Sequence, residues 1–457
     1  MTSDLLLDYQ MVRELQKQVA DLQLADRRTR TAQGLAELTV ADEQQKAQSL
    51  IRLVVSRHMQ ARIAAGDELP DPDYDARLRG ALFAAIYGAG ELQELLEDPL
   101  VENIDINGFD EVWVRYAGGD KLRWRAIASS NEHLVSIVQT LGSYAGMNAR
   151  PFSPATPELD VRLTDGSRLS AIMAATETPS VSIRRNRYPH VFLRPDLAAA
   201  AARRGGEVPP DLVTLGTLTP ELADFLYAAV RARANIVVGG ATDTGKTTLL
   251  RALINCIDPD ERLITVERAL ELGVGRHPEL HRDVREMEEV LPDPDGKGGV
   301  DIAALVRRTR RMNPDRCIVG EVLGPEVVEM LSAMAQGNNG SLSTIHARDA
   351  VEVFNRIATY AKQHEGLDFD VTHSLIAGAI DFVVFIEKND RAGGRRCVTQ
   401  VLEIAGFAEG RVARNPIFSP SRVDGRAERD PEVAITAARA KQLASVGYHE
   451  RTGTWQW

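Results

Sequence analysis

The chain has 457 residues, a formal net charge of −11, 44% hydrophobic residues and 26% charged residues. That length predicts about two to four domains, and that composition is typical of folded globular protein rather than of disordered or fibrous chains. The negative net charge disfavours broad electrostatic capture of DNA or RNA, so we expect no direct nucleic-acid partner.

Three cysteines occur, Cys256, Cys317 and Cys397, far apart and without metal-ligand spacing, as expected in a reducing cytoplasm. No apolar run reaches the ~18 residues of a membrane-spanning helix, and the best candidate, 374–387, is interrupted by Asp381. The N-terminus lacks the basic start and apolar centre of a signal peptide. We therefore expect a cytoplasmic protein that contacts a membrane only through partners.

Residues 1–94 are predicted to form a helical N-terminal extension. Its first apolar stripe has a 7, 3, 4, 3 spacing and consists of Leu5, Val12, Leu15, Val19 and Leu22. The stripe is too short for a coiled coil, so a helix that docks on a partner is the better interpretation. A second amphipathic stretch covers 45–66 and ends in a loop rich in proline and aspartate.

Residues 95–190 predict a small α+β domain. Segments 101–108 and 111–124 alternate like strands, a helix is expected at 131–146, and 159–174 reads as a hairpin with Asp-Gly at its tip. Residues 191–212 contain an alanine run, a Gly-Gly and a Pro-Pro, which favour a linker or a surface insertion.

Residues 213–410 alternate short, continuously apolar segments with helical patterns. The expected strands include 235–240, 262–267, 317–322 and 341–347. Such alternation predicts an α/β domain with a mostly parallel sheet covered on both faces. A polar tail with one helix, at 431–446, is expected over 411–457.

One loop of this domain satisfies the phosphate-binding pattern G-x-x-x-x-G-K-[ST] between an apolar strand and a leucine-rich helix. Successive N–H groups and the helix N-terminus would hold the phosphates. Lys246 would reach the β- and γ-phosphates, and the Thr247 hydroxyl would bind Mg²⁺. The predicted phosphate-binding residues are Gly240, Thr242, Thr244, Gly245, Lys246, Thr247 and Thr248.

Asp243 places a carboxylate inside this loop, where negative charge opposes anion binding. If the backbone needs a positive φ at this position, Asp and Asn are the most tolerant side chains after glycine. We therefore predict that Asp243 is present for backbone shape and that its carboxylate turns outward or pairs with an arginine.

Two glutamates end apolar strands that follow the loop, Glu267 and Glu321, and Glu271 lies four residues beyond the first. Parallel strands bring such carboxylates to one edge, where one can hold Mg²⁺ through water and the other can activate water. The alternative for each is a surface glutamate at a strand end. His346 ends another apolar strand; it reads either as a γ-phosphate contact or as a satisfied interior histidine.

The remaining histidines show no spacing typical of a metal site; they include His277, His281, His364 and His373. On the sequence alone, no metal is expected beyond Mg²⁺ on Thr247 and Glu321.

Four segments, in their order and spacing, resemble the type II/type IV secretion ATPase superfamily, in particular its CpaF-like branch that drives Tad (Flp) pilus assembly, in the actinobacterial form. The segments are GATDTGKTTLLRAL, RLITVERALEL, RRMNPDRCIVGEVLGPEVVEML and QGNNGSLSTIHA. LEDPLVENIDING, before them, resembles the family's N-terminal domain. The resemblance implies a RecA-like P-loop motor domain in a hexameric ring that hydrolyses ATP and acts on an inner-membrane platform protein, at the cytoplasmic face of the membrane.

The resemblance also implies roles for individual residues. Glu267 matches the proposed catalytic glutamate, Glu321 the Walker B glutamate and His346 the His-box histidine. Arginines that match phosphate-reaching positions of the N-terminal domain are Arg162, Arg168, Arg184 and Arg185. For each of them, an ordinary surface arginine remains the alternative.

The sequence departs from the family pattern in several places, namely Ala241, Asp243, Arg268, Leu323 and Asn338. These departures leave open a ring that binds nucleotide with little turnover. A conjugation-type ATPase for DNA transfer is the other alternative, since the motor motifs do not separate it from a pilus-assembly or type II-like secretion motor.

Overall fold

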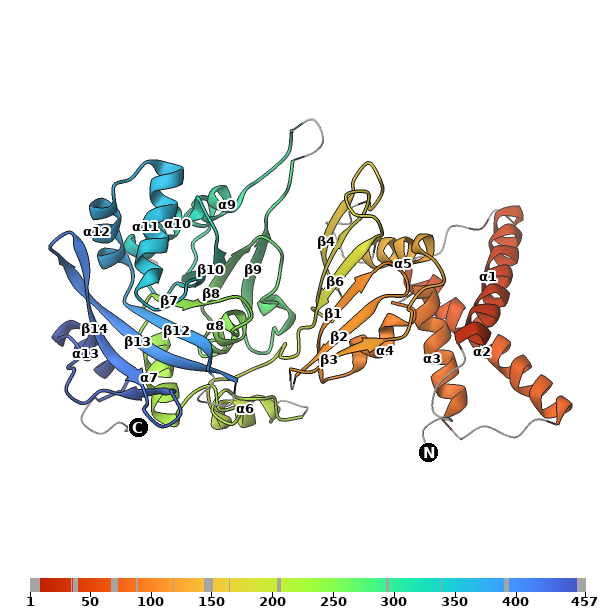
Figure 1. Cartoon of the computed structure of the whole chain (residues 1–457), viewed down its shortest axis with the longest axis horizontal. Coiled ribbons are helices and arrows are strands. Elements are labelled where there is room, and N and C mark those ends of the chain that lie inside the picture. Colours follow the sequence, from red (N-terminus) through yellow and green to blue (C-terminus); the bar gives the residue numbers. More distant parts are fainter. Residues whose placement is uncertain are drawn as a thin grey trace. The chain divides into compact units, whose positions relative to one another are not determined.

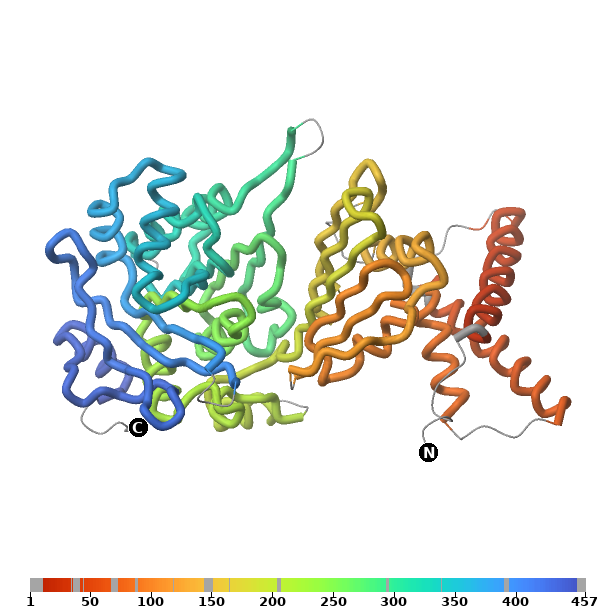
Figure 2. The backbone as a smooth tube through the Cα atoms, viewed as in Figure 1, coloured from red at the N-terminus to blue at the C-terminus, as the bar shows by residue number. Residues whose placement is uncertain are grey.

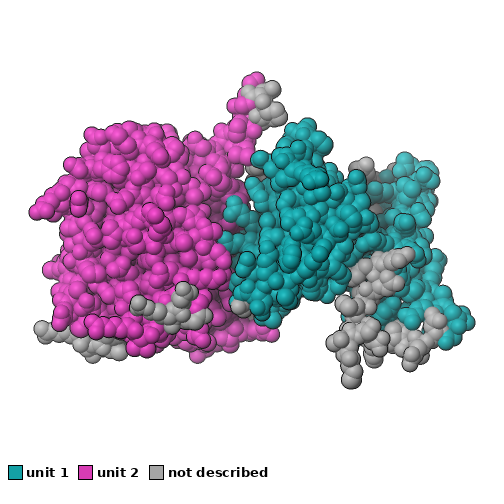
Figure 3. Space-filling model, in the orientation of Figure 1, with its two compact units in different colours: residues 1–187 teal, residues 188–457 magenta. Residues whose placement is uncertain are grey.

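The computed structural model describes most of the chain. The described residues are 9–33, 35, 40–66, 73–87, 89–117, 119–143, 151–163, 165–203, 207–292, 296–337, 339–389 and 394–449. They divide into two compact units, residues 1–187 and residues 188–457 (Figure 3). No helix within these described ranges combines the length and the apolar composition needed to cross a membrane.

The first unit contains five helices and six strands among its described residues. They are α1 (Tyr9–Ala32), α2 (Val40–Ala65), α3 (Tyr74–Tyr87), α4 (Leu92–Glu97), β1 (Val101–Asn107), β2 (Val112–Tyr116), β3 (Lys121–Trp124), α5 (Asn131–Ser143), β4 (Glu158–Arg162), β5 (Arg168–Ile172) and β6 (Ser180–Arg184). The strands form one sheet in the order β3-β2-β1-β6-β5-β4, and every pairing is antiparallel.

Helices α1, α2 and α3 share a small apolar core of their own (Figure 1). Val12, Leu15 and Val19 of the predicted docking stripe are at most 4% exposed, because α2 and α3 cover them. Leu5 lies outside the described residues. The expectation of a stripe free to dock on a partner is therefore wrong for its described part, which stabilises this helical region instead.

The second unit is built on a nine-stranded sheet. Its strands are β7 (Ile236–Gly240), β8 (Arg262–Glu267), β9 (Asp283–Glu288), β10 (Arg316–Val322), β11 (Leu342–His346), β12 (Phe382–Asn389), β13 (Arg395–Ala408), β14 (Arg411–Pro420) and β15 (Ala427–Arg429). Their order is β15-β14-β13-β12-β7-β11-β10-β8-β9. The strands from β12 to β9 run parallel, whereas β13, β14 and β15 pair antiparallel. The predicted mostly parallel α/β sheet is confirmed.

Helices cover both faces of this sheet. Figure 2 traces the backbone through the unit. One face packs against α7 (Pro220–Arg231), α8 (Lys246–Ile254) and α13 (Ala437–Ala444), the other against α9 (Ile302–Thr309), α10 (Glu326–Ala335), α11 (Glu352–Glu365) and α12 (Phe369–Ala379). In β7, Ile236 and Val238 join the first core and Val237 joins the second, because successive side chains of a strand face opposite sides.

Residues 191–212 do not behave as the predicted linker. Val191, Leu193 and Leu212 belong to the main core of the second unit, and α6 (Pro195–Ala202) lies between them. Residues 411–449 likewise belong to this unit rather than to a separate tail, since β14 pairs with β13 and Phe418 is fully buried. The alanine run is helical because alanine has the highest helix propensity.

Candidate functional site

The predicted site residues of the second unit end four neighbouring strands. Gly240 ends β7, His346 ends β11, Glu267 ends β8, and Glu321 is the residue before the last in β10. In the sheet these strands follow one another in the order β7-β11-β10-β8 and run parallel. Their carboxyl ends therefore meet at one edge of the sheet, where α/β proteins bind ligands.

The loop from β7 to α8 has the backbone shape that its sequence predicts. Asp243 has φ 61° and Gly245 has φ 97°, both in the left-handed region. Gly240 is required for another reason, since a Cβ there would lie 2.3 Å from the Ile386 carbonyl oxygen. The prediction that Asp243 occupies a positive-φ position is confirmed.

Asp243 is also paired. Arg396 of β13 donates from Nε to the Asp243 backbone oxygen at 2.9 Å and from a terminal nitrogen to Asp243 Oδ2 at 3.0 Å. The guanidinium thus holds both the loop backbone and the carboxylate, and it compensates the negative charge. The predicted arginine partner is confirmed.

Lys246 begins α8 and is only 6% exposed. Its Nζ donates to the Ala241 carbonyl oxygen at 2.9 Å and contacts His346 Nδ1 at 3.0 Å. Glu321 Oε1 lies 4.0 Å from the same nitrogen. The lysine is therefore held across the loop, beside the ends of β11 and β10.

His346 connects the lysine to Glu321. An ammonium only donates, so Nδ1 of a neutral His346 accepts from Lys246 and its ring proton lies on Nε2. That nitrogen lies 2.9 Å from Glu321 Oε1, to which it donates. Lys246, His346 and Glu321 form one hydrogen-bonded chain, and the His346 side chain, which is 34% exposed, has both ring nitrogens in contact with a partner.

Glu267 lies in a different environment. It is 4% exposed, and its Oε2 accepts from the backbone nitrogens of Glu271, at 2.8 Å, and Leu272, at 2.9 Å. Its Oε1 is buried and has no hydrogen-bond partner among the described residues. Burial raises the pKa of Glu267 to about 7 despite the two backbone donors. Gly320 of β10 makes room for it, because a Cβ there would lie 2.8 Å from Glu267 Cγ.

Glu271 is the site residue to which the sequence assigned no role. Its Oε2 lies 3.5 Å from the Thr247 hydroxyl, which donates to it. The signal was present in the sequence, since Glu271 follows Glu267 by four residues. The sequence did not indicate that the Glu271 side chain points toward Thr247, because that orientation depends on the loop whose backbone nitrogens bond to Glu267.

The other loop threonines differ from one another. The Thr244 hydroxyl is buried and donates to the Ala241 carbonyl oxygen at 2.9 Å, so this side chain stabilises the loop. Thr242 is exposed and Thr248 is half-buried. For Thr244, a contact with phosphate would have to come from the backbone N–H.

Oxygen atoms suited to Mg²⁺ are present among these side chains. Mg²⁺ takes oxygen ligands, keeps several waters and uses one or two carboxylates. The Thr247 hydroxyl faces the Glu271 carboxylate, and the Glu321 side chain is 35% exposed. This donor set fits the ion.

Three of the four predicted arginines form a row in the sheet of the first unit. Arg162 of β4 lies opposite Arg168 of β5, and Arg168 lies opposite Arg184 of β6. Directly opposed residues share a face of the sheet, so these three arginines lie on the same side of it. Arg185 does not join the row; it contacts the Leu95 carbonyl oxygen and, at 3.7 Å, Asp165.

The departures from the family pattern also have partners. Arg268 Nε pairs with Glu289 at 3.2 Å, and the Leu323 backbone nitrogen donates to Glu326. Asn338 lies outside the described residues. The Arg268 side chain and the Leu323 backbone are thus held by partners, and the chain of Lys246, His346 and Glu321 is intact.

The phosphate-binding loop and the carboxylates at the strand ends define a P-loop protein with a RecA-like arrangement. Residues 87–407 match the family model described as "Type II/IV secretion system protein". The chain belongs to this family, which comprises secretion ATPases.

The chain is also similar to individual proteins. The chain is 35% identical over 366 residues to the "Putative conjugal transfer protein Rv3659c" of Mycobacterium tuberculosis, covering 78% of this chain and 94% of that protein. It is 30% identical over 306 residues to protein VirB11 of Agrobacterium fabrum, covering 64% of this chain and 86% of that protein. Among solved structures, the VirB11 ATPase of the Brucella suis type IV secretion system, in complex with sulphate, matches with 26% identity, covers 68% of this chain and 95% of that chain, and has a TM-score of 0.36.

Proposed function

We propose that the chain hydrolyses ATP with Mg²⁺ and converts the released free energy into mechanical work for a secretion or pilus-assembly machine. The observation that carries this proposal is the chain of Lys246, His346 and Glu321, at the sheet edge where Glu267 also ends its strand. A purely structural P-loop would not need its lysine beside a histidine and two carboxylates from three neighbouring strands at one edge.

In this proposal each side chain has a separate task. Lys246 exchanges the Ala241 carbonyl oxygen and His346 for phosphate oxygens, while the loop N–H groups and the N-terminus of α8 hold the same anion. Thr247 and Glu321 hold Mg²⁺, which neutralises phosphate charge when bound. When Lys246 moves to phosphate, His346 loses its contact with the lysine and keeps its hydrogen bond to Glu321, so phosphate binding changes the surroundings of Glu321.

Glu267 is the proposed general base. A general base works best when its pKa lies near the operating pH, and burial places the pKa of Glu267 at about 7. Its Oε1 has no described partner and so can accept a proton from water, whereas Oε2 stays on the backbone of Glu271 and Leu272.

We further propose a ring of six copies at the cytoplasmic face of the inner membrane, acting on a membrane-embedded platform protein of a Tad/Flp pilus or a type II-like secretion system. The resemblance of the motor motifs supports this proposal. The row of Arg162, Arg168 and Arg184 supplies a basic surface suited to phosphate, as arginine forks match oxyanions. Arg185 is left out of this role because it contacts Asp165 and Leu95 instead.

A conjugation-type or type IV secretion motor is the second candidate. The names of two relatives favour it, one assigned to conjugal transfer and one being VirB11. Genes beside this one distinguish the candidates: prepilin and platform genes support pilus assembly, whereas a relaxase gene supports DNA transfer.

Phosphate release from ATP and Mg²⁺ tests the activity itself. We expect turnover by the wild-type chain and none above background for Lys246→Ala, because the variant loses charge-assisted bonds to phosphate. Lys441→Ala, on α13, is the matched control and should turn over like the wild type. Wild-type turnover by Lys246→Ala would place the activity elsewhere, and no turnover by any of the three proteins would refute hydrolysis.

A further inference from the structure

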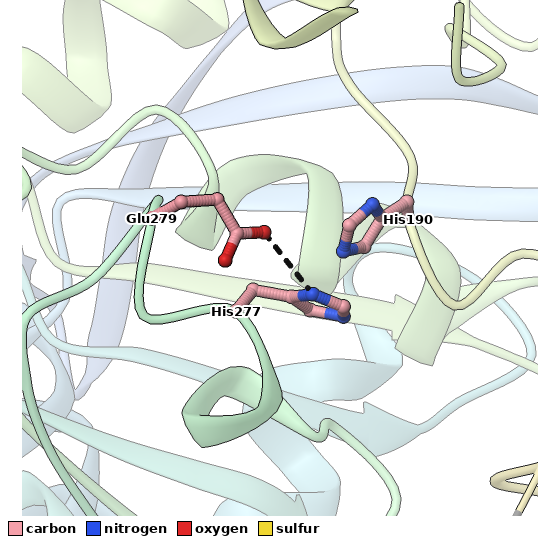
Figure 4. Close-up of side chains that lie close together, drawn as sticks. All are labelled: His190, His277 and Glu279. Carbon is pink, nitrogen blue, oxygen red and sulfur yellow. Dashed lines mark ion pairs between the residues drawn. The ribbon is translucent and has the colours of Figure 1, made fainter. Parts of the chain in front are cut away.

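A second cluster of polar side chains lies in the same unit and takes no part in the proposed hydrolysis. It consists of His190, His277 and Glu279 (Figure 4). His190 comes from the segment before α6, whereas His277 and Glu279 follow η2 (Val274–Arg276) in the loop between β8 and β9. More than eighty positions separate the two parts in the sequence, so spacing alone could not have indicated the cluster.

The ligand atoms of the cluster converge. One nitrogen or oxygen from each residue lies within 4.8 Å of the other two, and His277 Nδ1 is 3.4 Å from Glu279 Oε1. Bonds of about 2.0–2.2 Å in a tetrahedral zinc site place neighbouring ligand atoms about 3.3–3.6 Å apart. The distance between His277 Nδ1 and Glu279 Oε1 therefore fits such a site, and a ring nitrogen of His190 lies within 4.8 Å of both other ligand atoms.

The His190 and His277 rings are in direct edge contact, with centroids 3.4 Å apart and ring planes at 66° to each other. His190 Nε2 is buried and has no hydrogen-bond partner among the described residues. Figure 4 shows the nitrogen-bearing edge of the His190 ring turned toward Glu279 and His277. A buried acceptor or donor without a partner is costly, and a bound cation would satisfy it.

Glu279 supplies a carboxylate to the cluster, and its negative charge would offset that of a bound cation.

We propose that His190, His277 and Glu279 form a site for a divalent transition metal of the Zn²⁺ class, with water in the fourth position. Two imidazoles and one carboxylate are a ligand set that zinc uses. Mg²⁺ and Ca²⁺ prefer oxygen ligands, so the ion that assists hydrolysis would not compete well here.

The position of the cluster indicates what the metal does. The loop that carries His277 and Glu279 begins at the end of β8, where Glu267 caps the backbone of Glu271 and Leu272. Arg251 of α8 joins the same two parts, donating to the carbonyl oxygens of Tyr188, Glu271 and Leu272. A metal ion bound here would therefore link residues 277–279 of the β8–β9 loop to the segment 188–190. This link would stabilise the loop that also contains Glu271.

Zinc binding to tag-free, full-length protein tests the proposal without any activity measurement. After removal of metals with a chelator, Zn²⁺ is titrated at pH 7.5 in excess Mg²⁺ and without nucleotide. We expect one equivalent per chain and a rise in the unfolding temperature of about 5 °C when Zn²⁺ is a hundredfold above its Kd. Co²⁺ should give the strong visible absorption of tetrahedral coordination.

Two variants and one control make the test specific. His277→Ala should weaken Zn²⁺ binding at least about 100-fold, and the conservative Glu279→Gln at least about tenfold, since even outer partners of metal ligands cost 10–100-fold. His364→Ala removes an exposed histidine of α11 and should change nothing. Circular dichroism of Glu279→Gln without zinc should match the wild type. Absence of stoichiometric binding by the wild type, or equal binding by Glu279→Gln and the His364→Ala control, would overturn the proposal.

Discussion

The glutamates at the ends of β8 and β10 occupy similar positions in the sequence but differ in burial and in hydrogen-bond partners. Glu267 and Glu321 both close apolar strands, and the two strands are neighbours in the sheet. Glu267 is 4% exposed and bonded to backbone nitrogens, whereas the Glu321 side chain is 35% exposed and bonded to His346. One carboxylate is dry and fixed, and the other is accessible and connected to the P-loop lysine.

This difference suggests a division of work. Desolvation raises the pKa of Glu267 to about 7, which suits proton transfer at neutral pH. Glu321 lies 4.0 Å from Lys246 and faces solvent, which suits a metal ion and the response to phosphate. If the division is correct, removing the charge of either glutamate should have effects of different kinds.

The largest effect is expected for Glu321→Gln. The amide keeps the shape but loses the charge that faces His346 and that would hold Mg²⁺, so turnover should fall about 100-fold. ATP binding should stay within about threefold, because the loop and Lys246 remain. Phosphate release and fluorescent-nucleotide titration measure the two quantities.

Glu365→Gln, at an exposed position near the end of α11, is the control for this experiment. It should retain wild-type turnover. An equal loss of nucleotide binding and turnover in Glu321→Gln would mark Glu321 as structural and would remove the distinction between the two strand ends.

A second, intermediate effect concerns Glu267 and pH. Its pKa is about 7 in the folded protein and 4.5 as the ordinary value. The folded state therefore holds the proton more tightly, and the stability contribution of Glu267 falls as pH rises from about 5 to 8. The loss is about 2 to 3 kcal/mol. Glu267→Gln should remove it, so that the free energy of unfolding depends less on pH.

Denaturant titrations at pH 5 and pH 8 measure that dependence. Glu365→Gln, at an exposed position near the end of α11, is the matched control and should keep the wild-type slope. If Glu267→Gln and the wild type lose stability equally between the two pH values, Glu267 does not titrate in this range and its proposed role as base fails.

The smallest effect on ATP affinity is expected for removing the charge of Asp243, because Arg396 already compensates it. Arg396 pairs with its carboxylate, so Asp243→Asn should change ATP affinity less than about threefold. An unpaired unit charge ~7 Å from the phosphates would cost about 2.4 kcal/mol at an effective dielectric of 20. Nucleotide titrations at low and moderate salt distinguish a carboxylate paired with Arg396 from one that repels the phosphates.

Asp243→Val sharpens the same test, because φ 61° is unfavourable for a β-branched side chain. We expect it to weaken ATP binding at least about tenfold through strain in the loop. A tenfold tightening by Asn that fades with added salt would instead show that the carboxylate repels the phosphates.

The errors of the sequence interpretation share one cause. β9 was not predicted, because DVREME is polar and half-buried at the sheet edge, where one neighbour suffices. The stripe of α1 was interpreted as a docking surface, because its cover comes from α2 and α3. The segment at 191–212 looked like a linker, although Val191 and Leu212 pack into the core. In each case the local composition was described correctly, but the burial of the segment depends on residues from other parts of the chain that pack against it.

The sequence by itself determined the alternation of apolar strands and helices, the P-loop and the candidate residues at the strand ends. These features depend on side-chain periodicity and on residue types within a few positions of one another. The tertiary structure alone decided that Glu267 is dry and Glu321 accessible, that Arg396 compensates Asp243, and that His190 meets His277. Burial, charge pairing and pKa depend on neighbours brought together from distant parts of the chain, and no local pattern records them.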